Sequence, residues 1–412
     1  MRYLAQHKII SWNAIARLLS VLFNFLVVLA VSRSLGPVAK GETTLWVTAI
    51  FIGVFASNIA GGWALVNYLK HNEKQSVLVP TYVWSLFANG LVALVMWATL
   101  AHSSQFIIHI FFLASISSFS SVHQTILLSK HRFKAFNFLT FWQPMVLWLA
   151  LAVLLYLGKN KTLDSFWIAL YISTLSALAV SFFLVYKTEK LAWGFSFTTL
   201  RAILANGFPF QLAELLQLLH LRLYFFLLAN FNESGLYHLG IYSVGISILE
   251  SVWIFPRSVA TINFAATVKQ PSAHNTLRWL RIALLLALVL LFSIFLIPIE
   301  VYAYVFGEGF LYVKYSVKYL FPGIGLYVFV LVIGSHFMGK GNYGLMSALH
   351  LVGIAISLLL CYVWIPDYEM SGAGLAATVS FAVSAAVLLF YFLKTEHYSL
   401  KDLWLHKEDF NF

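Results

Sequence analysis

Charged side chains are scarce in this sequence, because Asp, Glu, Lys and Arg make up only 10% of its 412 residues. In soluble domains such residues account for roughly a quarter of the chain. Hydrophobic residues reach 61% here, and the mean hydropathy is +0.85. A soluble fold of this length could not bury so much apolar surface, so the sequence predicts a protein whose solvent is lipid.

Cysteine is nearly absent, and so is any alternation of polar and apolar residues. The single cysteine, Cys361, excludes an internal disulfide and a metal site built from several cysteines. Strands of a membrane barrel would alternate. The apolar stretches are instead continuous over about twenty residues, the length that an α-helix needs to cross the hydrocarbon core. We therefore predict an all-α polytopic membrane protein, and no enzyme, because no connection could hold a folded catalytic domain.

Apolar runs divide the chain into two groups of six. The predicted spans are 9–31, 44–69, 80–101, 106–128, 138–157, 165–186, 208–230, 240–264, 279–299, 318–338, 345–366 and 370–393. A long connection follows the sixth span, as in transporters built from two six-helix lobes. The expected organisation is an N-terminal lobe (1–190), a cytoplasmic connection (191–207), a C-terminal lobe (208–393) and a cytoplasmic tail (394–412). The tail is either a short amphipathic helix on the membrane surface or disordered.

Lysine and arginine are distributed unevenly between the two sides of the predicted spans. Seventeen of the 26 fall on the side of the N-terminus, six on the opposite side and three inside spans. Because cytoplasmic loops carry an excess of these residues, the bias predicts that both termini are cytoplasmic. The net charge of +11 follows from the same bias, so we expect no nucleic-acid partner.

A polar stripe follows the first span. Asn13, Arg17, Ser20 and Asn24 are spaced by four, three and four residues, which places them on one face of a helix. The stripe is either a hydrogen-bonding seam between helices or one wall of a water-filled cavity. An arginine near the centre of a span costs roughly 2.5–3.5 kcal/mol, and this cost favours the cavity.

Two later spans carry further charges. Gln211, Glu214 and Arg222 share one face of the seventh span, while Glu250 and Arg257 share a face of the eighth. Two interpretations are open for these spans. The glutamates and arginines neutralise each other in pairs, or these helices line the same cavity as the first span.

Three arginines inside spans indicate an anionic substrate. A guanidinium group binds phosphate oxygens through two hydrogen bonds and stays charged, so phosphate or pyrophosphate fits better than a cationic drug. Glu214 and Glu250 could instead take up a proton or a sodium ion, which leaves coupling to an H⁺ or Na⁺ gradient open. No cofactor is predicted, and no histidine pair has the spacing of a metal site.

Four motifs carry a resemblance to a known family. They are Ser32-Arg33-Ser34-Leu35-Gly36-Pro37-Val38-Ala39-Lys40-Gly41-Glu42, Val305-Phe306-Gly307 followed by Phe310, Leu320-Phe321-Pro322-Gly323, and Gly372-Ala373-Gly374-Leu375-Ala376-Ala377-Thr378. In order and spacing they resemble segments of Wzx-type polysaccharide flippases, members of the multidrug/oligosaccharidyl-lipid/polysaccharide (MOP) exporter superfamily. The sequence departs at Ala39, where the family often has glycine, and at Phe321, where leucine is common.

The resemblance implies two six-helix lobes in a V, within the bacterial cytoplasmic (inner) membrane. Members flip undecaprenyl-pyrophosphate-linked oligosaccharides to the periplasmic leaflet for O-antigen or capsule synthesis, beside other polysaccharide-assembly membrane proteins. Their cleft cations are often in the first and seventh helices, which matches Arg17 and Arg222 in kind. In this hypothesis the arginines hold the phosphates, and asparagine and glutamine bind the sugars. The candidate substrate-binding residues are Asn13, Arg17, Asn24, Gln211, Glu214, Arg222, Glu250 and Arg257.

Two other functions compete with a flippase. An ion-coupled multidrug exporter of the same superfamily would have a cleft dominated by carboxylates, and three arginines argue against it. A membrane glycosyltransferase or polysaccharide polymerase usually carries a large extramembrane loop with catalytic acids or arginines. The longest loops of this chain reach only about twenty residues and lack an acidic cluster.

Overall fold

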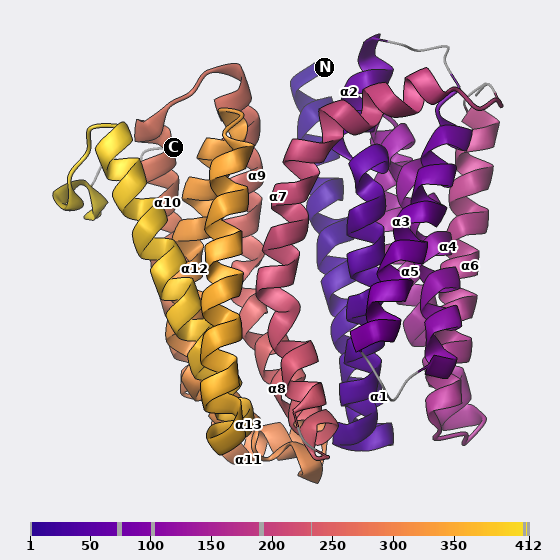
Figure 1. Cartoon of the computed structure of the whole chain (residues 1–412), viewed down its shortest axis with the longest axis vertical. Helices are drawn as coiled ribbons and strands as arrows, with labels where there is room; N and C mark the ends of the chain where they lie inside the picture. Colours follow the sequence, from indigo (N-terminus) through magenta and orange to yellow (C-terminus); the bar gives the residue numbers. More distant parts are fainter. Residues whose placement is uncertain are drawn as a thin grey trace. The chain divides into compact units, whose positions relative to one another are not determined.

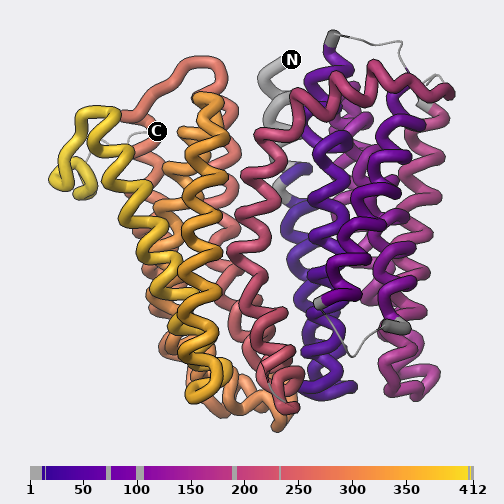
Figure 2. The backbone as a smooth tube through the Cα atoms, in the orientation of Figure 1, coloured from indigo at the N-terminus to yellow at the C-terminus, as the bar shows by residue number. Residues whose placement is uncertain are grey.

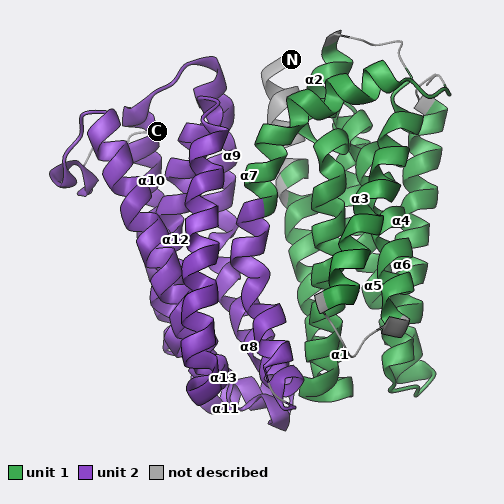
Figure 3. Cartoon of the chain, viewed as in Figure 1, with its two compact units in different colours: residues 1–215 green, residues 216–412 purple. Residues whose placement is uncertain are grey.

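The structure is a computed structural model, which describes residues 2–71, 76–99, 104–188, 193–231, 233–406 and 409. Every regular element in this part of the chain is a helix (Figure 1). The chain divides into two compact units, Met1–Leu215 and Leu216–Phe412 (Figure 3). The boundary between them falls inside one helix, which therefore contributes to both units.

Unit 1 is built around its first helix, which packs against α3, α4 and α5. Its elements are α1 (Arg2–Gly61), α2 (Trp63–His71), α3 (Leu78–Thr99), α4 (Ser104–Ser129), α5 (Phe133–Ala152), a π-helical turn (Val153–Leu157), α6 (Leu163–Thr188) and the first part of α7 (Phe197–Asn230). Figure 2 traces these helices from indigo to magenta.

Unit 2 is built around α12 (Val313–Gly339), which packs against α8, α9, α10 and α13. Its other elements are the second part of α7, α8 (Gly235–Glu250), a 3-10 turn (Ser251–Trp253), α9 (Ile254–Lys269), α10 (Ala273–Phe295), α11 (Ile299–Phe306), a second 3-10 turn (Glu308–Phe310), α13 (Tyr343–Thr395) and a third 3-10 turn (Leu400–Leu403).

Ten helical segments of the described residues are long and apolar enough to cross a membrane. Two of them are interrupted, α1 at Gly36 and α13 at Glu369, where the backbone leaves the helical region. Each interruption separates two of the predicted spans, and with these divisions the segments account for all twelve. Apolar side chains such as Phe87, Leu157 and Phe390 are exposed, as lipid contact requires. The prediction of an all-α polytopic membrane protein is confirmed.

The break in α1 follows from its sequence. Gly36 has φ 80° and ψ −178°, a combination that is essentially restricted to glycine. Pro37 comes next, and a proline pushes the preceding residue out of the helical region. The break in α13 differs, because Glu369 adopts φ 49° with a side chain in place. Its Oε2 lies 3.0 Å from Nε2 of His238, on α8, and this contact holds Glu369 in place.

We expect Gly36→Ala to lower the free energy of unfolding by about 1–3 kcal/mol, the usual cost of this conformation for a residue with a Cβ. The effect is conformational, because no atom lies within 4 Å of the position that the Cβ would take. Thermal unfolding of the purified protein in detergent measures it. Gly344→Ala is the matched control, since its surroundings are equally open but its backbone is helical. Equal Tm values for the two variants would contradict the prediction.

Helix α7 begins at Phe197, well before the predicted start of the seventh span at 208. Leu200, Ile203 and Leu204 explain the difference, because their spacing gives this segment one apolar face. Leu200 and Ile203 are buried in a core cluster with Ala60, Leu65, Leu139 and other residues of unit 1, and Leu204 packs against it. The predicted connection is therefore partly helical, and it anchors α7 in unit 1.

Candidate functional site

The stripe of the first span lies on α1, before the break at Gly36. Arg17 and Asn24 are exposed, and Asn13 and Ser20 are half-buried. Nε of Arg17 donates to Oδ1 of Asn13 at 3.3 Å. Nδ2 of Asn24 donates to the carbonyl of Ser20 at 2.8 Å. Each amide is thus held by a hydrogen bond within one turn of the helix, Asn13 to Arg17 and Asn24 to Ser20. Arg17 forms no ion pair with any residue that the structure describes, so its charge is available to a ligand.

The candidate residues of α7 are not all in the same unit. Gln211 and Glu214 belong to unit 1, and Arg222 belongs to unit 2. Gln211 is buried, and a Cβ on Gly62 would lie 3.3 Å from its Oε1, so this amide packs against the end of α1. Glu214 is half-buried and has an interaction partner of its own.

Arg222 and Glu250 form a two-pronged ion pair in unit 2. Nη1 donates to Oε1 and Nη2 donates to Oε2, each at 2.7 Å. Their side chains are only 21% and 13% exposed, so little solvent screens the pair. The guanidinium also lies 5.3 Å from the ring centre of Phe225. The sequence left two interpretations open for the seventh and eighth spans, charges that pair with each other or charges that line a cavity. Arg222 and Glu250 are paired.

Arg257 is different, because it is exposed and forms no ion pair with any described residue. Its guanidinium lies over the ring of Trp253, 5.3 Å from the centroid. Trp253 is fully buried, and its Nε1 donates to the carbonyl of Ile324 at 2.9 Å, so the ring is a fixed platform. Glu250 also interacts electrostatically with Arg257. Two arginines around one carboxylate leave unit 2 with a net positive site on α7, α8 and α9.

A buried network of hydrogen bonds lies beside this site in unit 2. Nε2 of His220 lies 2.7 Å from Oγ of Ser380, and Tyr224 lies 2.6 Å from Ser357. Ser357 donates to Ser380 at 3.0 Å, which joins the two pairs. Ser357 and Ser380 lie on the two halves of α13, far from His220 and Tyr224 in the sequence, so the sequence pattern does not reveal these contacts. Because the network is buried and its groups are bonded, it fixes α7 against α13.

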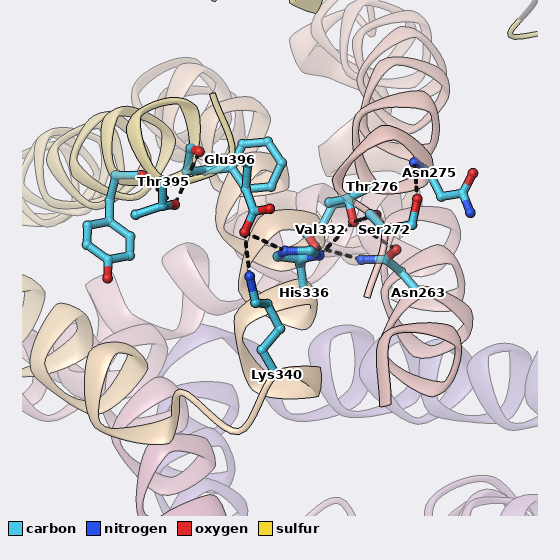
Figure 4. A network of polar contacts seen from close by, with 11 residues as sticks. Asn263, Ser272, Asn275, Thr276, Val332, His336, Lys340, Thr395 and Glu396 are labelled. Carbon is cyan, nitrogen blue, oxygen red and sulfur yellow. Dashed lines mark hydrogen bonds and ion pairs between the residues drawn. The ribbon is translucent and has the colours of Figure 1, made fainter. Parts of the chain in front are cut away.

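A second network joins four helices at the other end of unit 2 (Figure 4). Thr276 of α10 lies 3.0 Å from Nδ1 of His336, whose Nε2 lies 3.2 Å from Glu396. Lys340 donates to the same carboxylate at 2.6 Å, and Thr276 donates to Asn263 of α9 at 3.1 Å. Burial raises the pKa of Glu396, but the hydrogen bonds from Lys340 and His336 outweigh it and hold the pKa below its usual value. The network fixes the ends of α9, α10, α12 and α13.

The exposed arginines give the candidate site an arrangement that suits the binding of an anion. In the described ranges, no group of three or more His, Cys, Asp or Glu side chains is placed to hold a metal ion. Arg17 and Arg257 are exposed and positively charged, whereas Glu250 neutralises Arg222. Each is set among groups that orient it. Such sites bind anions through charge-assisted hydrogen bonds.

No model of a protein family matches the chain. No curated protein matches it either. Solved structures do. A lipid II flippase, MurJ, in an inward closed conformation has a TM-score of 0.70 and 13% identity, over 95% of this chain and 88% of that one. An inward-facing multidrug resistance MATE family transporter of the MOP superfamily has a TM-score of 0.65 and 17% identity, over 91% and 94%.

A third match is a MOP superfamily transporter from Pyrococcus furiosus, described as having a binding pocket of reverse polarity. Its TM-score is 0.65 and its identity 16%, over 93% of both chains. All of these likenesses extend over nearly the full length of the chain. The chain therefore has the fold of MOP-superfamily transporters, and the fold implied by its motifs is confirmed at this level.

Proposed function

We propose that this protein is a transporter that flips undecaprenyl-pyrophosphate-linked oligosaccharides from the cytoplasmic to the periplasmic leaflet by alternating access. The observation that carries the proposal is the pair of exposed arginines within spans, Arg17 and Arg257, neither of which forms an ion pair with a described residue. Exposed cations at this depth are expensive unless they face an anion or water. The likeness to a lipid II flippase supports a lipid-linked substrate.

In this proposal Arg17 in unit 1 and Arg257 in unit 2 are each a candidate contact for the pyrophosphate. Arg222 differs from its expected role, because both of its Nη groups already donate to the carboxylate of Glu250. We assign the pair of Arg222 and Glu250 to positioning, because its net charge is near zero. Arg257 is then the exposed cation of this site. The sugars hydrogen-bond to amides, for which Asn13, Asn24 and Gln211 are the candidates. Glu214 is then the candidate for a coupling proton or sodium ion.

The location is proposed on the distribution of lysine and arginine. The protein would reside in the bacterial cytoplasmic membrane with both termini in the cytoplasm. Its lobes would be 1–190 and 208–393, joined by the cytoplasmic connection 191–207 and followed by the tail 394–412. It would act in O-antigen or capsule synthesis, beside other polysaccharide-assembly membrane proteins.

Leaflet accessibility of the lipid-linked glycan tests the proposal. An impermeant sugar-modifying reagent is applied to spheroplasts in which the protein is present, depleted, or carries Arg17→Ala or Arg257→Ala. We expect depletion to trap the glycan inside. Each substitution should slow its appearance about tenfold or more, because a hydrogen bond to a charged group contributes roughly 1.5–3 kcal/mol. Arg201→Ala is the matched control, since this arginine is exposed but lies outside the predicted spans.

The outcomes separate the parts of the proposal. If depletion leaves accessibility unchanged, the chain does not flip that glycan. If depletion traps the glycan but both arginine variants behave like Arg201→Ala at equal expression, flipping stands and the cationic site fails. A second candidate function is multidrug export, which the likeness to a multidrug resistance MATE transporter favours. It predicts that depletion raises drug susceptibility and leaves the glycan accessible.

A further inference from the structure

The segment after α13 folds back onto unit 2. The 3-10 turn Leu400–Leu403 packs against α10 (Figure 1, yellow). Nε of Arg281, on α10, donates to Oδ2 of Asp409 at 2.7 Å, and a second hydrogen bond joins its Nη2 to Oδ1. Nη1 of Arg281 donates to the carbonyl of Asp402 at 2.8 Å. Because the side chains of Arg281 and Asp409 are 5% and 1% exposed, this clamp is buried and fixes residues 394–406 in place.

The clamped segment turns apolar side chains outward. Trp404 is 76% exposed, Leu400 is 66% exposed and Leu405 is 46% exposed. A tail with no binding role would gain stability by packing these groups on α10, and the clamp gives it the proximity to do so. Their outward orientation therefore indicates that an apolar environment other than the protein core lies beside the segment.

The outward face is also positively charged. The acidic groups of the segment are bound internally, Glu396 to Lys340 and Asp402 to the backbone and hydroxyl of Ser399. These two hydrogen bonds from Ser399 hold the pKa of Asp402 below its usual value, so the group is charged but satisfied. Lys394 and Lys401 are exposed and form no ion pair with any described residue. The segment thus presents two lysines and three apolar side chains.

The position of the segment matches the surface of a bilayer. It follows the last turn of the spanning helix α13 and contacts the spanning helix α10 near Arg281. Further along α10, exposed side chains such as Leu288 and Phe292 are apolar, as contact with acyl chains requires. The segment therefore lies where the hydrocarbon gives way to headgroups, the depth that tryptophan prefers.

We propose that residues 394–406 bind anionic phospholipid headgroups. Trp404, Leu400 and Leu405 enter the boundary between headgroups and acyl chains, and Lys394 and Lys401 interact with the lipid phosphates. Arg281 holds the segment at this depth through Asp409. The interaction is independent of what the protein transports. It requires only that the bilayer surface around unit 2 carries negative charge.

A fluorophore on the segment tests the proposal in the full-length protein. Cys361 is buried and is replaced by serine, and Leu405→Cys is labelled with an environment-sensitive dye. The protein is reconstituted in nanodiscs of phosphatidylcholine alone or mixed in equal parts with phosphatidylglycerol. Quenching by a nitroxide lipid reports membrane contact, and quenching by iodide reports water. Lys161→Cys, on an exposed loop without apolar neighbours in the chain, is the matched control.

We expect strong nitroxide quenching of the dye at position 405 in anionic nanodiscs, weaker quenching in neutral ones, and none at position 161. Lys394→Gln with Lys401→Gln should weaken attachment to anionic nanodiscs on the order of tenfold, since each lysine near an anionic surface contributes several-fold. Salt of about 1 M should have the same effect, because it screens charges beyond about 3 Å.

Three results would overturn the proposal. Iodide quenching without nitroxide quenching in anionic nanodiscs would place the segment in water. Protection from both quenchers would show that the face is covered by protein. Equal nitroxide quenching in both lipids, unaffected by the lysine substitutions, would show that the segment does not recognise lipid charge.

Discussion

Replacing Glu250 by leucine should destabilise unit 2 by about 3–5 kcal/mol, because the change leaves the guanidinium of Arg222 without its partner in a poorly hydrated site. The two hydrogen bonds of 2.7 Å disappear together. The neighbouring cation Arg257 then adds repulsion that Glu250 had offset. Thermal unfolding in detergent, followed by tryptophan fluorescence, measures the loss as a drop in Tm and in folded yield.

A double-mutant cycle distinguishes pairing from mere burial. Arg222→Met alone should destabilise the protein by a similar amount, since it leaves the carboxylate unpaired. The variant with both substitutions should recover most of the loss, because removing both charges of a buried pair is often close to neutral. Glu300→Leu, at an exposed position on α11, is the control and should shift stability by no more than about 0.5 kcal/mol. Additive losses in the cycle would show that the pair is not coupled.

Gly207→Ala should destabilise unit 1 by about 1–3 kcal/mol or more, through overpacking. A Cβ at this position would lie 2.1 Å from the carbonyl oxygen of Ile59 and 2.7 Å from Cβ of Ala64. The first of these neighbours is backbone, which cannot rotate away as a long side chain can. Helix α7 must therefore move away from the end of α1. Thermal unfolding measures the loss, and proteolysis within 193–196 reports detachment of the helix start.

Gly90→Ala is the matched control for this substitution. Gly90 is also in a helix, α3, but its Cβ would meet only the ring of Phe111 at 3.8 Å, an ordinary contact. Alanine stabilises a helix interior by roughly 0.5–1 kcal/mol over glycine, so the control should gain stability. If Gly207→Ala gained as much, the close approach of α7 to α1 would not exist in the folded protein.

The spans could be predicted from the sequence because each is a local property of about twenty residues. The break at Gly36 could also be predicted, since glycine and proline act on their own backbone. The start of α7 was missed, because the segment around Leu200 and Ile203 is amphipathic and a search for continuous apolar runs passes over it. Its core partners come from other parts of the chain, which only the folded unit brings together.

The candidate site divides in the same way. The contact between Arg17 and Asn13 spans four residues and follows from helical periodicity. The pair of Arg222 with Glu250 joins residues 28 positions apart, and Arg257 was an equally good partner by sequence. Which arginine is neutralised depends on how α7 lies beside the end of α8, where Glu250 is the last residue. The sequence pattern could therefore identify the candidate arginines, but it could not show which of them is paired with Glu250 and which is exposed.

Because α7 crosses the boundary between the units, the order in which the chain is synthesised has a consequence for its insertion. The core of unit 1 is complete only when Leu200 and Ile203 have left the ribosome. The same helix carries His220 and Tyr224, whose partners Ser380 and Ser357 are made 160 and 133 residues later. Throughout that interval the nascent helix holds two polar groups in lipid without their final partners. His220 can therefore form its hydrogen bond with Ser380 only after the last span of unit 2 has been synthesised.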